Sequence, residues 1–235
     1  MQLRGHAHAS GAGQAVVTDP ERLRAISLFA DFGDDALQRV SSSTTLHRYD
    51  RGDRVFCEGD ASHHLYVMLR GRIAITSRAD DGRESMFALM EDGDVFGEMG
   101  MLIDNRRSAH ARALEPSEVL EVPYDVVRAE FDAEPRLLWS LAGLLAERLR
   151  NVDAALADSL FLDVTGRTAK RLLELADGAD EFTLPVTQEE LAGMVGASRE
   201  RVNKALASFV RLGWLKVADR QYTLVDRQQL TRRAT

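Results

Sequence analysis

The sequence predicts an α+β fold with three parts in order: a rolled antiparallel sheet of the jelly-roll type, one long helix, and a C-terminal winged helix-turn-helix. Three observations predict this order. Short strand-like segments separated by acidic-glycine turns fill residues 48–122, apolar residues then recur at helical spacing over 132–161, and two short helical segments flank a glycine turn at 196–198. We therefore expect a mobile tail (1–19), a β-roll domain (20–131), a helix with a hinge (132–162) and a C-terminal domain (163–235).

Composition indicates a folded protein that does not cross a membrane. The 235 residues are 45% hydrophobic and 29% charged, as in ordinary globular chains. Cys57 is the only cysteine, so one chain can form neither a disulfide nor a four-cysteine metal cluster, and a cytoplasmic location is expected. The longest apolar run, residues 137–146, is shorter than the roughly eighteen residues that span a bilayer. The N-terminal residues lack a continuous apolar core, so we predict a tail and no signal peptide.

The charge is unevenly distributed along the chain. Its formal value is −7, but residues 164–235 carry 12 Lys and Arg against 9 Asp and Glu, while the preceding part is strongly acidic. Such an asymmetry is expected if only the C-terminal part contacts the phosphates of a nucleic acid.

Two short helices are expected at residues 21–29 and 34–43, ahead of the sheet. The strand-like segments that follow are separated by turns at 50–53, 58–60, 80–82 and 91–94, each containing Asp or Glu beside Gly. Regular short strands with such turns are typical of a closed or rolled antiparallel sheet.

One apolar stripe marks the long helix. Its members fall at steps of three and four: Leu138, Leu141, Leu145, Leu149, Val152, Leu156 and Leu160. A long helix with one narrow apolar stripe needs a partner surface, which is either its own β-roll domain or the same helix of a second copy. The second interpretation makes these residues a dimer interface, with a hinge near Asp163.

The C-terminal domain carries two helix-start signals. Thr187 with Glu190 three residues later forms a capping box, so a helix is predicted to begin at Gln188 and to end at Gly196. Ser198 is expected to cap a second helix, whose buried face would contain Val202, Leu206 and either Phe209 or Val210. A hairpin is expected at 214–225, which completes a winged helix-turn-helix.

In a helix-turn-helix, the first turn of the second helix faces the bases of the major groove. Arg199, Glu200 and Lys204 are the candidates for reading a G/C-containing half-site, because Arg and Lys suit guanine and a carboxylate accepts from cytosine. Phosphate contacts are expected from Thr187, Gln188 and Arg201, beside the cap residue Ser198. The alternative is a solvated helix face with a local Glu–Arg pair.

Several motifs in one order resemble those of the CRP/FNR family of bacterial transcription regulators, from about residue 20 onward. They are LRGRIAI, DDGRE, EDGDVFGE, GEMGMLIDNRRSA, FLDVTGR and VGASRERVNKAL. The chain is most similar to the cyclic-AMP receptor branch, including its actinobacterial relatives. The resemblance implies a DNA-binding transcription regulator, and no enzyme, whose β-roll binds a cyclic nucleotide and whose long helix forms a homodimer.

The resemblance also implies a ligand site in the cassette GEMGMLIDNRRSA. The residue matching the family's ribose-binding glutamate is Glu98, Arg107 matches the arginine that neutralises the cyclic phosphate, and Ser108 adds a hydroxyl donor. Gly97, Met99 and Ala109 belong to the same cassette. The family's two adenine-contacting positions hold Val152 and Asp153, so cyclic AMP, cyclic GMP, cyclic di-GMP and a regulator active without ligand all stay open.

The expected partners are a second copy of the chain and a palindromic DNA operator with TGTGA-like half-sites, and RNA polymerase is a further candidate. No tightly bound cofactor, metal or membrane partner is expected. Three other interpretations are open: a haem sensor using His47, His63, His64 or His110, a cupin-like metalloenzyme using His63, His64 and Glu98, and an architectural DNA-binding protein that needs no ligand. The enzyme is disfavoured, because adjacent histidines on a strand point in opposite directions.

Overall fold

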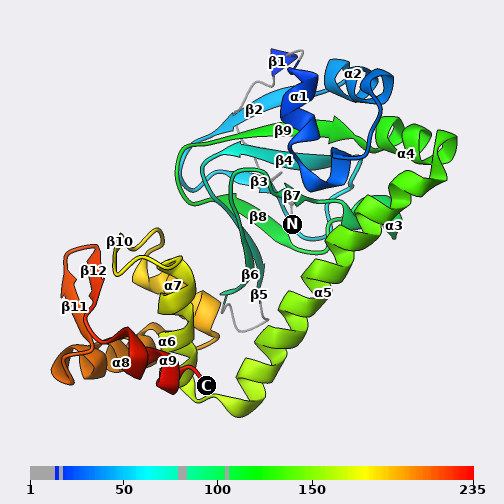
Figure 1. Ribbon diagram of the computed structural model, residues 1–235. Coiled ribbons are helices and arrows are strands. Elements are labelled where there is room, and N and C mark those ends of the chain that lie inside the picture. The colour runs from blue at the N-terminus through cyan, green and yellow to red at the C-terminus, as the bar shows by residue number, and fades with distance from the viewer. Residues whose placement is uncertain (1–13, 16–17, 79–83, 104–105) are drawn as a thin grey trace, which may run out of the picture. The chain divides into compact units, whose positions relative to one another are not determined.

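The computed structural model describes residues 14–15, 18–78, 84–103 and 106–235. The described residues form two compact units, one made of those up to 148 without 84–86, and the other of 149–235 with 84–86. Figure 1 shows a β-roll with short helices in the first unit and a small helical domain in the second. The predicted tail at 1–19 and the predicted turn at 80–82 fall largely outside the described residues. Within the tail, residues Gln14–Ala15 form strand β1.

The first unit contains two antiparallel sheets, as the predicted jelly roll requires. One sheet has the order β1-β2-β9-β4-β7 and the other has the order β3-β8-β5-β6. Their remaining strands are β2 (Thr45–Tyr49), β3 (Arg54–Phe56), β4 (His64–Arg70), β5 (Ile73–Arg78), β6 (Glu84–Met90), β7 (Val95–Phe96), β8 (His110–Ala113) and β9 (Ser117–Pro123).

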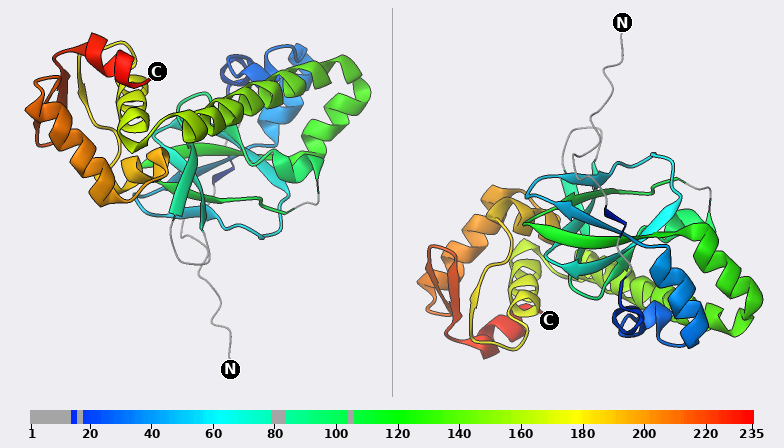
Figure 2. Two further views of the ribbon diagram at one scale, coloured as in Figure 1. Left: turned by 90° about the horizontal axis from the view of Figure 1, so that it is seen from below. Right: turned by 90° about the horizontal axis from the view of Figure 1, so that it is seen from above.

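Strand β4 shows how alternation along a strand builds two cores. Leu65 and Val67 face the helices, whereas Tyr66 and Met68 face the space between the sheets. The helices are α1 (Pro20–Arg24), η1 (Ser27–Phe29), α2 (Asp34–Ser42) and α4 (Tyr124–Ala133). Figures 1 and 2 show α1 and α2 beside α4 at one end of the roll. Helices α2 and α4 are also joined by a bidentate ion pair between Arg39 and the buried Glu130, at 2.7 and 2.8 Å.

The long helix α5 spans Leu138–Phe161, so it begins six residues later than predicted. The prediction that the helix starts at Asp132 is wrong, because Asp132 belongs to α4. Pro135 lacks a backbone N–H and pushes Glu134 out of the helical region, to φ −137° and ψ 83°. A short 3-10 turn, η2 (Pro135–Leu137), separates the two helices.

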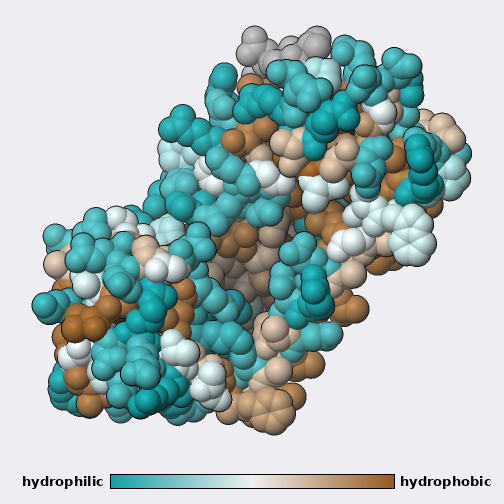
Figure 3. Space-filling view, in the orientation of Figure 1, coloured by the Kyte–Doolittle hydropathy of each residue, from teal (hydrophilic) through white to brown (hydrophobic). Residues whose placement is uncertain are grey.

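The apolar stripe of α5 divides into two parts. Leu141 is only 3% exposed and packs in the core of the first unit, and Leu145 packs partly against that core. The prediction that Leu141 lies in a dimer interface is therefore wrong, because its side chain is buried within one chain. In the first turns of the helix, the apolar stripe packs against the core of the first unit. The other predicted members, Leu138, Leu149, Val152, Leu156 and Leu160, are between 45% and 71% exposed. Figure 3 shows apolar side chains along the surface formed by α5.

The C-terminal unit contains the predicted helix-turn-helix. Helix α7 (Gln188–Val195) begins with the expected capping box between Thr187 and Glu190, and ends at Gly196 with φ +67°, a left-handed conformation that suits glycine. Ser198 caps α8 (Arg199–Arg211) by accepting from the Arg201 N–H. The buried face of α8 contains Val202, Leu206 and Phe209, while Val210 is exposed.

A three-stranded sheet of order β10-β12-β11 completes the wing. The predicted hairpin is formed by β11 (Leu215–Ala218) and β12 (Gln221–Leu224), but strand β10 (Glu181–Thr183) was not foreseen. Helix α6 (Val164–Leu175) begins at the cap residue Asp163. A further helix, α9 (Arg227–Arg233), packs against α6 and was also not foreseen.

Candidate ligand pocket and nucleic-acid interface

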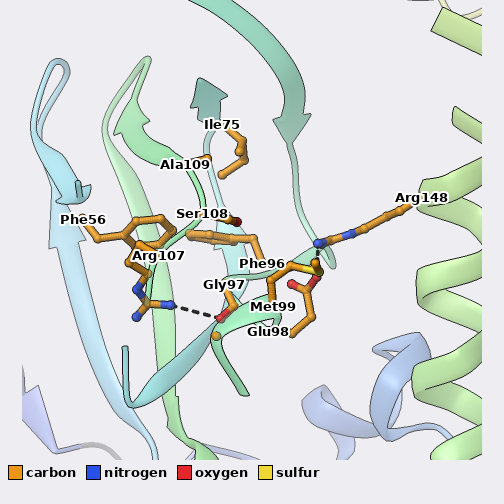
Figure 4. Close-up of a pocket in the computed structure, with 11 residues that line it drawn as sticks. Phe56, Ile75, Phe96, Gly97, Glu98, Met99, Arg107, Ser108, Ala109 and Arg148 are labelled. Atoms are coloured by element: carbon orange, nitrogen blue, oxygen red, sulfur yellow. Dashed lines mark hydrogen bonds and ion pairs between the residues drawn. The ribbon is translucent and has the colours of Figure 1, made fainter. Parts of the chain in front are cut away.

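A pocket opens between strands β7 and β8 and the short helix α3 (Met99–Leu102). The pocket encloses about 360 Å³ when the open space at its mouth is counted. Eleven residues line it: Phe56, Ile75, Phe96, Gly97, Glu98, Met99, Gly100, Arg107, Ser108, Ala109 and Arg148 (Figure 4). Six of the eight residues predicted to bind the nucleotide are therefore brought together here.

The guanidinium of Arg107 is held by aromatic and backbone groups. Its Nη1 donates to the carbonyl oxygen of Gly97 at 3.0 Å and to the hydroxyl of Tyr124 at 3.2 Å, while Nη2 lies 3.5 Å from the hydroxyl of Tyr66. The Phe56 ring lies 4.2 Å beneath its central carbon. Cation–π contacts and hydroxyl groups therefore orient this side chain without neutralising its charge.

Arg107 is a buried cation without an anion among the described residues. The residue is only 6% exposed, no described carboxylate forms an ion pair with it, and its Nε has no hydrogen-bond partner there. Burying an unpaired charge is costly, so such a site favours an anionic ligand. Ser108 is exposed beside it and offers a hydroxyl.

Glu98 provides the complementary acceptor on the opposite wall. The residue is fully buried, and its Oε1 pairs with Arg148, a side chain that reaches the pocket from α5 (Figure 4). Its second oxygen, Oε2, has no hydrogen-bond partner among the described residues. Arg148 also donates to the carbonyl oxygen of Val95. A hydroxyl donor on a ligand would satisfy the free oxygen of Glu98.

Two buried tyrosines contact the Arg107 guanidinium. Burial raises the pKa of both the Tyr66 and Tyr124 hydroxyls, against the opposing effect of Arg107, so both stay protonated as donors. Tyr124 donates to the Gly97 carbonyl oxygen, and its hydroxyl lies 2.5 Å from that of Ser62. These tyrosines and Arg148 were not predicted, since they lie far from the cassette in sequence.

Val152 and Asp153, the other two predicted ligand residues, do not line this pocket. Both lie exposed on the part of α5 that belongs to the second unit. Within the described chain they make no contribution to the ligand walls.

The predicted DNA-binding residues gather at the start of α8 and α7. Arg199, Glu200, Arg201 and Lys204 are exposed, and none of them forms an ion pair within the part of the chain that is described. The alternative of a local Glu–Arg pair is therefore not observed. Ser198 and Thr187 use their hydroxyls to cap α8 and α7, and Gln188 is the first residue of α7.

The histidines do not form a metal centre in the described structure. Among the described residues, no group of three or more His, Cys, Asp or Glu could hold a metal ion. His47 lies 3.0 Å from the carboxylate of Glu121, His64 lies 3.4 Å from the same carboxylate, and His110 accepts from the Glu58 N–H at 3.1 Å.

Comparisons with known proteins identify both domains. Residues 46–134 match the cyclic nucleotide-binding domain, and residues 166–233 match the Crp-like helix-turn-helix domain. A CRP-like cAMP-activated global transcriptional regulator from Mycobacterium tuberculosis is 35% identical over 221 residues, which cover 91% of this chain and 99% of the relative. The chain belongs to the CRP/FNR family of transcription regulators.

Two further proteins similar to this CRP/FNR-family chain are also described as global regulators. The cAMP-activated global transcriptional regulator Vfr of Pseudomonas aeruginosa is 34% identical, over 77% of this chain and 89% of the relative. The c-di-GMP responsive global regulator CLP of Xanthomonas campestris has a solved structure with a TM-score of 0.72 and 27% identity, covering 82% of this chain and 99% of that one. The chain is thus a transcription regulator with a cyclic nucleotide-binding domain and a DNA-binding domain, and its family is not one of enzymes. No described helix is both long and apolar enough to span a bilayer.

Proposed function

We propose that this chain is a homodimeric, sequence-specific transcription regulator whose affinity for DNA is controlled by cyclic AMP bound beside Arg107. The ligand assignment rests on one observation. The buried Arg107 guanidinium, which has no described counter-ion, lines the same pocket as the buried Glu98 carboxylate, whose Oε2 has no described hydrogen-bond partner. A cyclic nucleotide supplies both an anion and a ribose hydroxyl. The relatives named as cAMP-activated support the choice of cyclic AMP.

Each wall of the pocket has a chemical role in this proposal. Arg107 and Ser108 bind the cyclic phosphate through charge-assisted and hydroxyl hydrogen bonds. Glu98 accepts from the ribose hydroxyl through Oε2. Gly97 has φ +78°, and a Cβ there would lie 2.6 Å from Arg107 Nη1, so only glycine leaves the guanidinium in place.

The ion pair between Glu98 and Arg148 gives the pocket a connection to α5. A ligand hydroxyl bound to Glu98 would change the charge environment of Arg148, which lies on the long helix. A ligand that interacts differently with two arrangements of α5 shifts their populations by that difference in free energy. We propose that this shift moves the segment near Asp163 between a bent and an extended form.

The dimer is supported by the exposed apolar side chains of α5. Leu149, Val152, Leu156 and Leu160 repeat at steps of three and four and are all more than half exposed. Pairing with the same stripe of a second copy would cover them. Two copies of α8 about 34 Å apart would then read a palindromic operator with TGTGA-like half-sites, which Arg199, Glu200 and Lys204 contact. We also propose that the dimer acts in the cytoplasm and that RNA polymerase is a further partner.

A second candidate ligand is cyclic di-GMP or cyclic GMP. Val152 has no polar side-chain atom and Asp153 only accepts, which is a poor match for adenine recognition by these positions. The likeness to a regulator described as c-di-GMP responsive supports this alternative. A regulator that binds DNA without any ligand is the remaining alternative.

Calorimetric titration with cyclic AMP, cyclic GMP and cyclic di-GMP tests the ligand assignment. Replacing Arg107 by Ala should weaken binding of the true ligand by about 30-fold or more, since losing the partner of a buried charge costs at least about 2 kcal/mol. Arg106→Ala is the matched control, because Arg106 is exposed and donates to Gly59 instead. Equal affinities of the two variants would refute the role of Arg107. A wild type that binds none of the three nucleotides would refute ligand control.

A further inference from the structure

The Tyr124 hydroxyl has every hydrogen-bonding position filled by neighbouring groups. It donates to the Gly97 carbonyl oxygen and accepts from Arg107 Nη1 at 3.2 Å. The Ser62 hydroxyl oxygen lies 2.5 Å away. A tyrosine hydroxyl has one proton and two lone pairs, so with its proton directed to Gly97 it can only accept from Ser62. Ser62 is therefore the donor of this bond, and it fixes the direction of the Tyr124 hydroxyl.

Ser62 and Tyr124 are both buried and lie outside the cassette. Ser62 has no exposed surface and lies in the loop between β3 and β4, while Tyr124 is 3% exposed and is the first residue of α4. The Tyr124 N–H donates to the His63 carbonyl oxygen at 2.9 Å, which ties the start of α4 to this loop. A Cβ on Gly100 would overlap the Ser62 hydroxyl, so α3 packs directly against the serine. The positions of the two hydroxyl groups are therefore set by the fold and not by a ligand.

The bond to Tyr124 also completes one end of the Arg107 guanidinium. Nη1 has two N–H groups, and it donates to Gly97 and to Tyr124. Nη2 has a single acceptor among the described residues, the Tyr66 hydroxyl at 3.5 Å, and Nε has none there. The donors left for a ligand are therefore Nε–H and one N–H of Nη2. A guanidinium uses two donors of this kind to bind two oxygens of one phosphate at once.

We propose that Ser62 and Tyr124 are positioning residues for the ligand, in a hydroxyl relay that runs from Ser62 through Tyr124 to Nη1 of Arg107. The relay fixes the rotation of the guanidinium and so presents its Nε–Nη2 edge to the phosphate. Neither Ser62 nor Tyr124 lines the pocket, so both act through Arg107 and not by contact with the ligand. The relay rests on the proposed function above, because the phosphate belongs to the cyclic nucleotide.

Tyr124→Phe removes only the hydroxyl group and keeps the buried ring. Arg107 Nη1 would then keep its bond to Gly97 but lose the second contact, which fixes the rotation of the guanidinium. Ordering a loosened side chain on binding costs free energy, so nucleotide affinity should fall about three- to tenfold. Ser62→Ala leaves Tyr124 in place but frees the direction of its hydroxyl, and should weaken binding about two- to threefold.

The order of the relay gives a readout that a general loss of stability would not produce. Once Tyr124→Phe has removed the hydroxyl that Ser62 fixes, adding Ser62→Ala should weaken binding no further. Arg107→Lys keeps the charge but has no planar group to orient, so Tyr124→Phe should cost less than about 1.5-fold in that background. A substitution that only loosened the fold would weaken binding by the same factor in both backgrounds.

The experiment measures nucleotide affinity for full-length variants by calorimetry, with whichever of cyclic AMP, cyclic GMP and cyclic di-GMP the wild type binds most tightly. Tyr49→Phe is the matched control and should bind like the wild type. Tyr49 is also a buried tyrosine of the β-roll, at 7% exposure, but its hydroxyl makes no hydrogen bond to Arg107. The relay is overturned if Tyr124→Phe binds as tightly as Tyr49→Phe, or if Ser62→Ala and Tyr124→Phe weaken binding by independent factors. An equal cost of Tyr124→Phe with Arg107 and with Arg107→Lys would also overturn it.

The relay and the proposed function fail in different ways. A wild type that binds none of the three nucleotides overturns the proposed function. Crystal structures of the ligand-free wild type and Tyr124→Phe then decide the relay without any ligand. We expect the Arg107 guanidinium in one position in the wild type, and turned away or spread over several positions in the variant. An unchanged guanidinium in Tyr124→Phe would overturn the relay.

Discussion

Gly100 lines the ligand pocket at a position with little room for a side chain. A Cβ at this position would lie 2.4 Å from the Ser62 hydroxyl oxygen and 2.9 Å from that of Tyr124. Gly100→Ala should therefore force these two side chains apart and cost about 1–3 kcal/mol of stability, as overpacked cores do. Thermal unfolding should show a melting temperature several degrees lower, at roughly 2–4 °C per kcal/mol.

Gly143 provides the contrast within the same unit. A Cβ there meets nothing within 4 Å, and the residue lies in the interior of α5. Gly143→Ala should stabilise the chain by about 0.5–1 kcal/mol, because Ala loses less backbone entropy in a helix. If Gly100→Ala left the melting temperature unchanged or raised it, as expected for Gly143→Ala, the close packing around Gly100 would be contradicted.

At the scale of residues, the sequence predicted the cassette better than its surroundings. Glu98 and Arg107 could be named because they stand in one short motif. Arg148 reaches the same pocket from α5, and Tyr66 and Tyr124 contact Arg107 from β4 and α4. No local pattern distinguishes these residues from any other buried tyrosine or helix arginine. The register of strands decides which of them meet, and a single sequence does not contain that information.

At the scale of elements, helix α8 has a polar first turn and a buried apolar face. We predict that Arg199→Ala reduces the preference for operator over random DNA by about 1–3 kcal/mol, since a bidentate contact to guanine contributes that much. Competition assays with both DNAs at fixed salt measure this difference.

Arg211 is the matched control for this substitution. It lies at the opposite end of α8, is exposed, and contacts only Ser208 of its own helix among the described residues. Arg211→Ala removes the same charge and should leave the preference for the operator unchanged. A similar loss from both variants would mean that Arg199 contributes only general attraction to phosphates.

Elements with local start and stop signals were the ones that could be predicted. The capping box at Thr187, the left-handed Gly196 and the Ser198 cap all depend on residues within one turn, and the structure confirms them. Strand β10 and helix α9 are short and carry no strong periodicity, so their existence depends on tertiary packing. The predicted start of α5 was too early because Pro135 interrupts the helix that the apolar spacing alone suggests.

At the scale of the whole molecule, the exposed stripe on α5 predicts a dimer. Leu156→Glu should place two carboxylates inside the paired helices and shift the protein towards monomer, which analytical ultracentrifugation detects. Binding to a palindromic operator should weaken in parallel, because two linked recognition helices bind more tightly than one.

Ala154→Glu tests whether the position of the new charge matters. Ala154 is also exposed on α5 but lies about 160° around the helix from Leu156, at 100° per residue. This variant should remain dimeric. If Leu156→Glu stayed dimeric as well, the stripe would not be the interface.

Protein atoms alone fix the Arg107 guanidinium, through the carbonyl oxygen of Gly97 and the hydroxyl groups of two tyrosines. A preorganised wall of this kind does not have to be ordered at the expense of the ligand's affinity. A small anionic ligand would therefore lose less binding free energy to ordering the site. More of that free energy would remain to shift the equilibrium between conformations elsewhere in the chain.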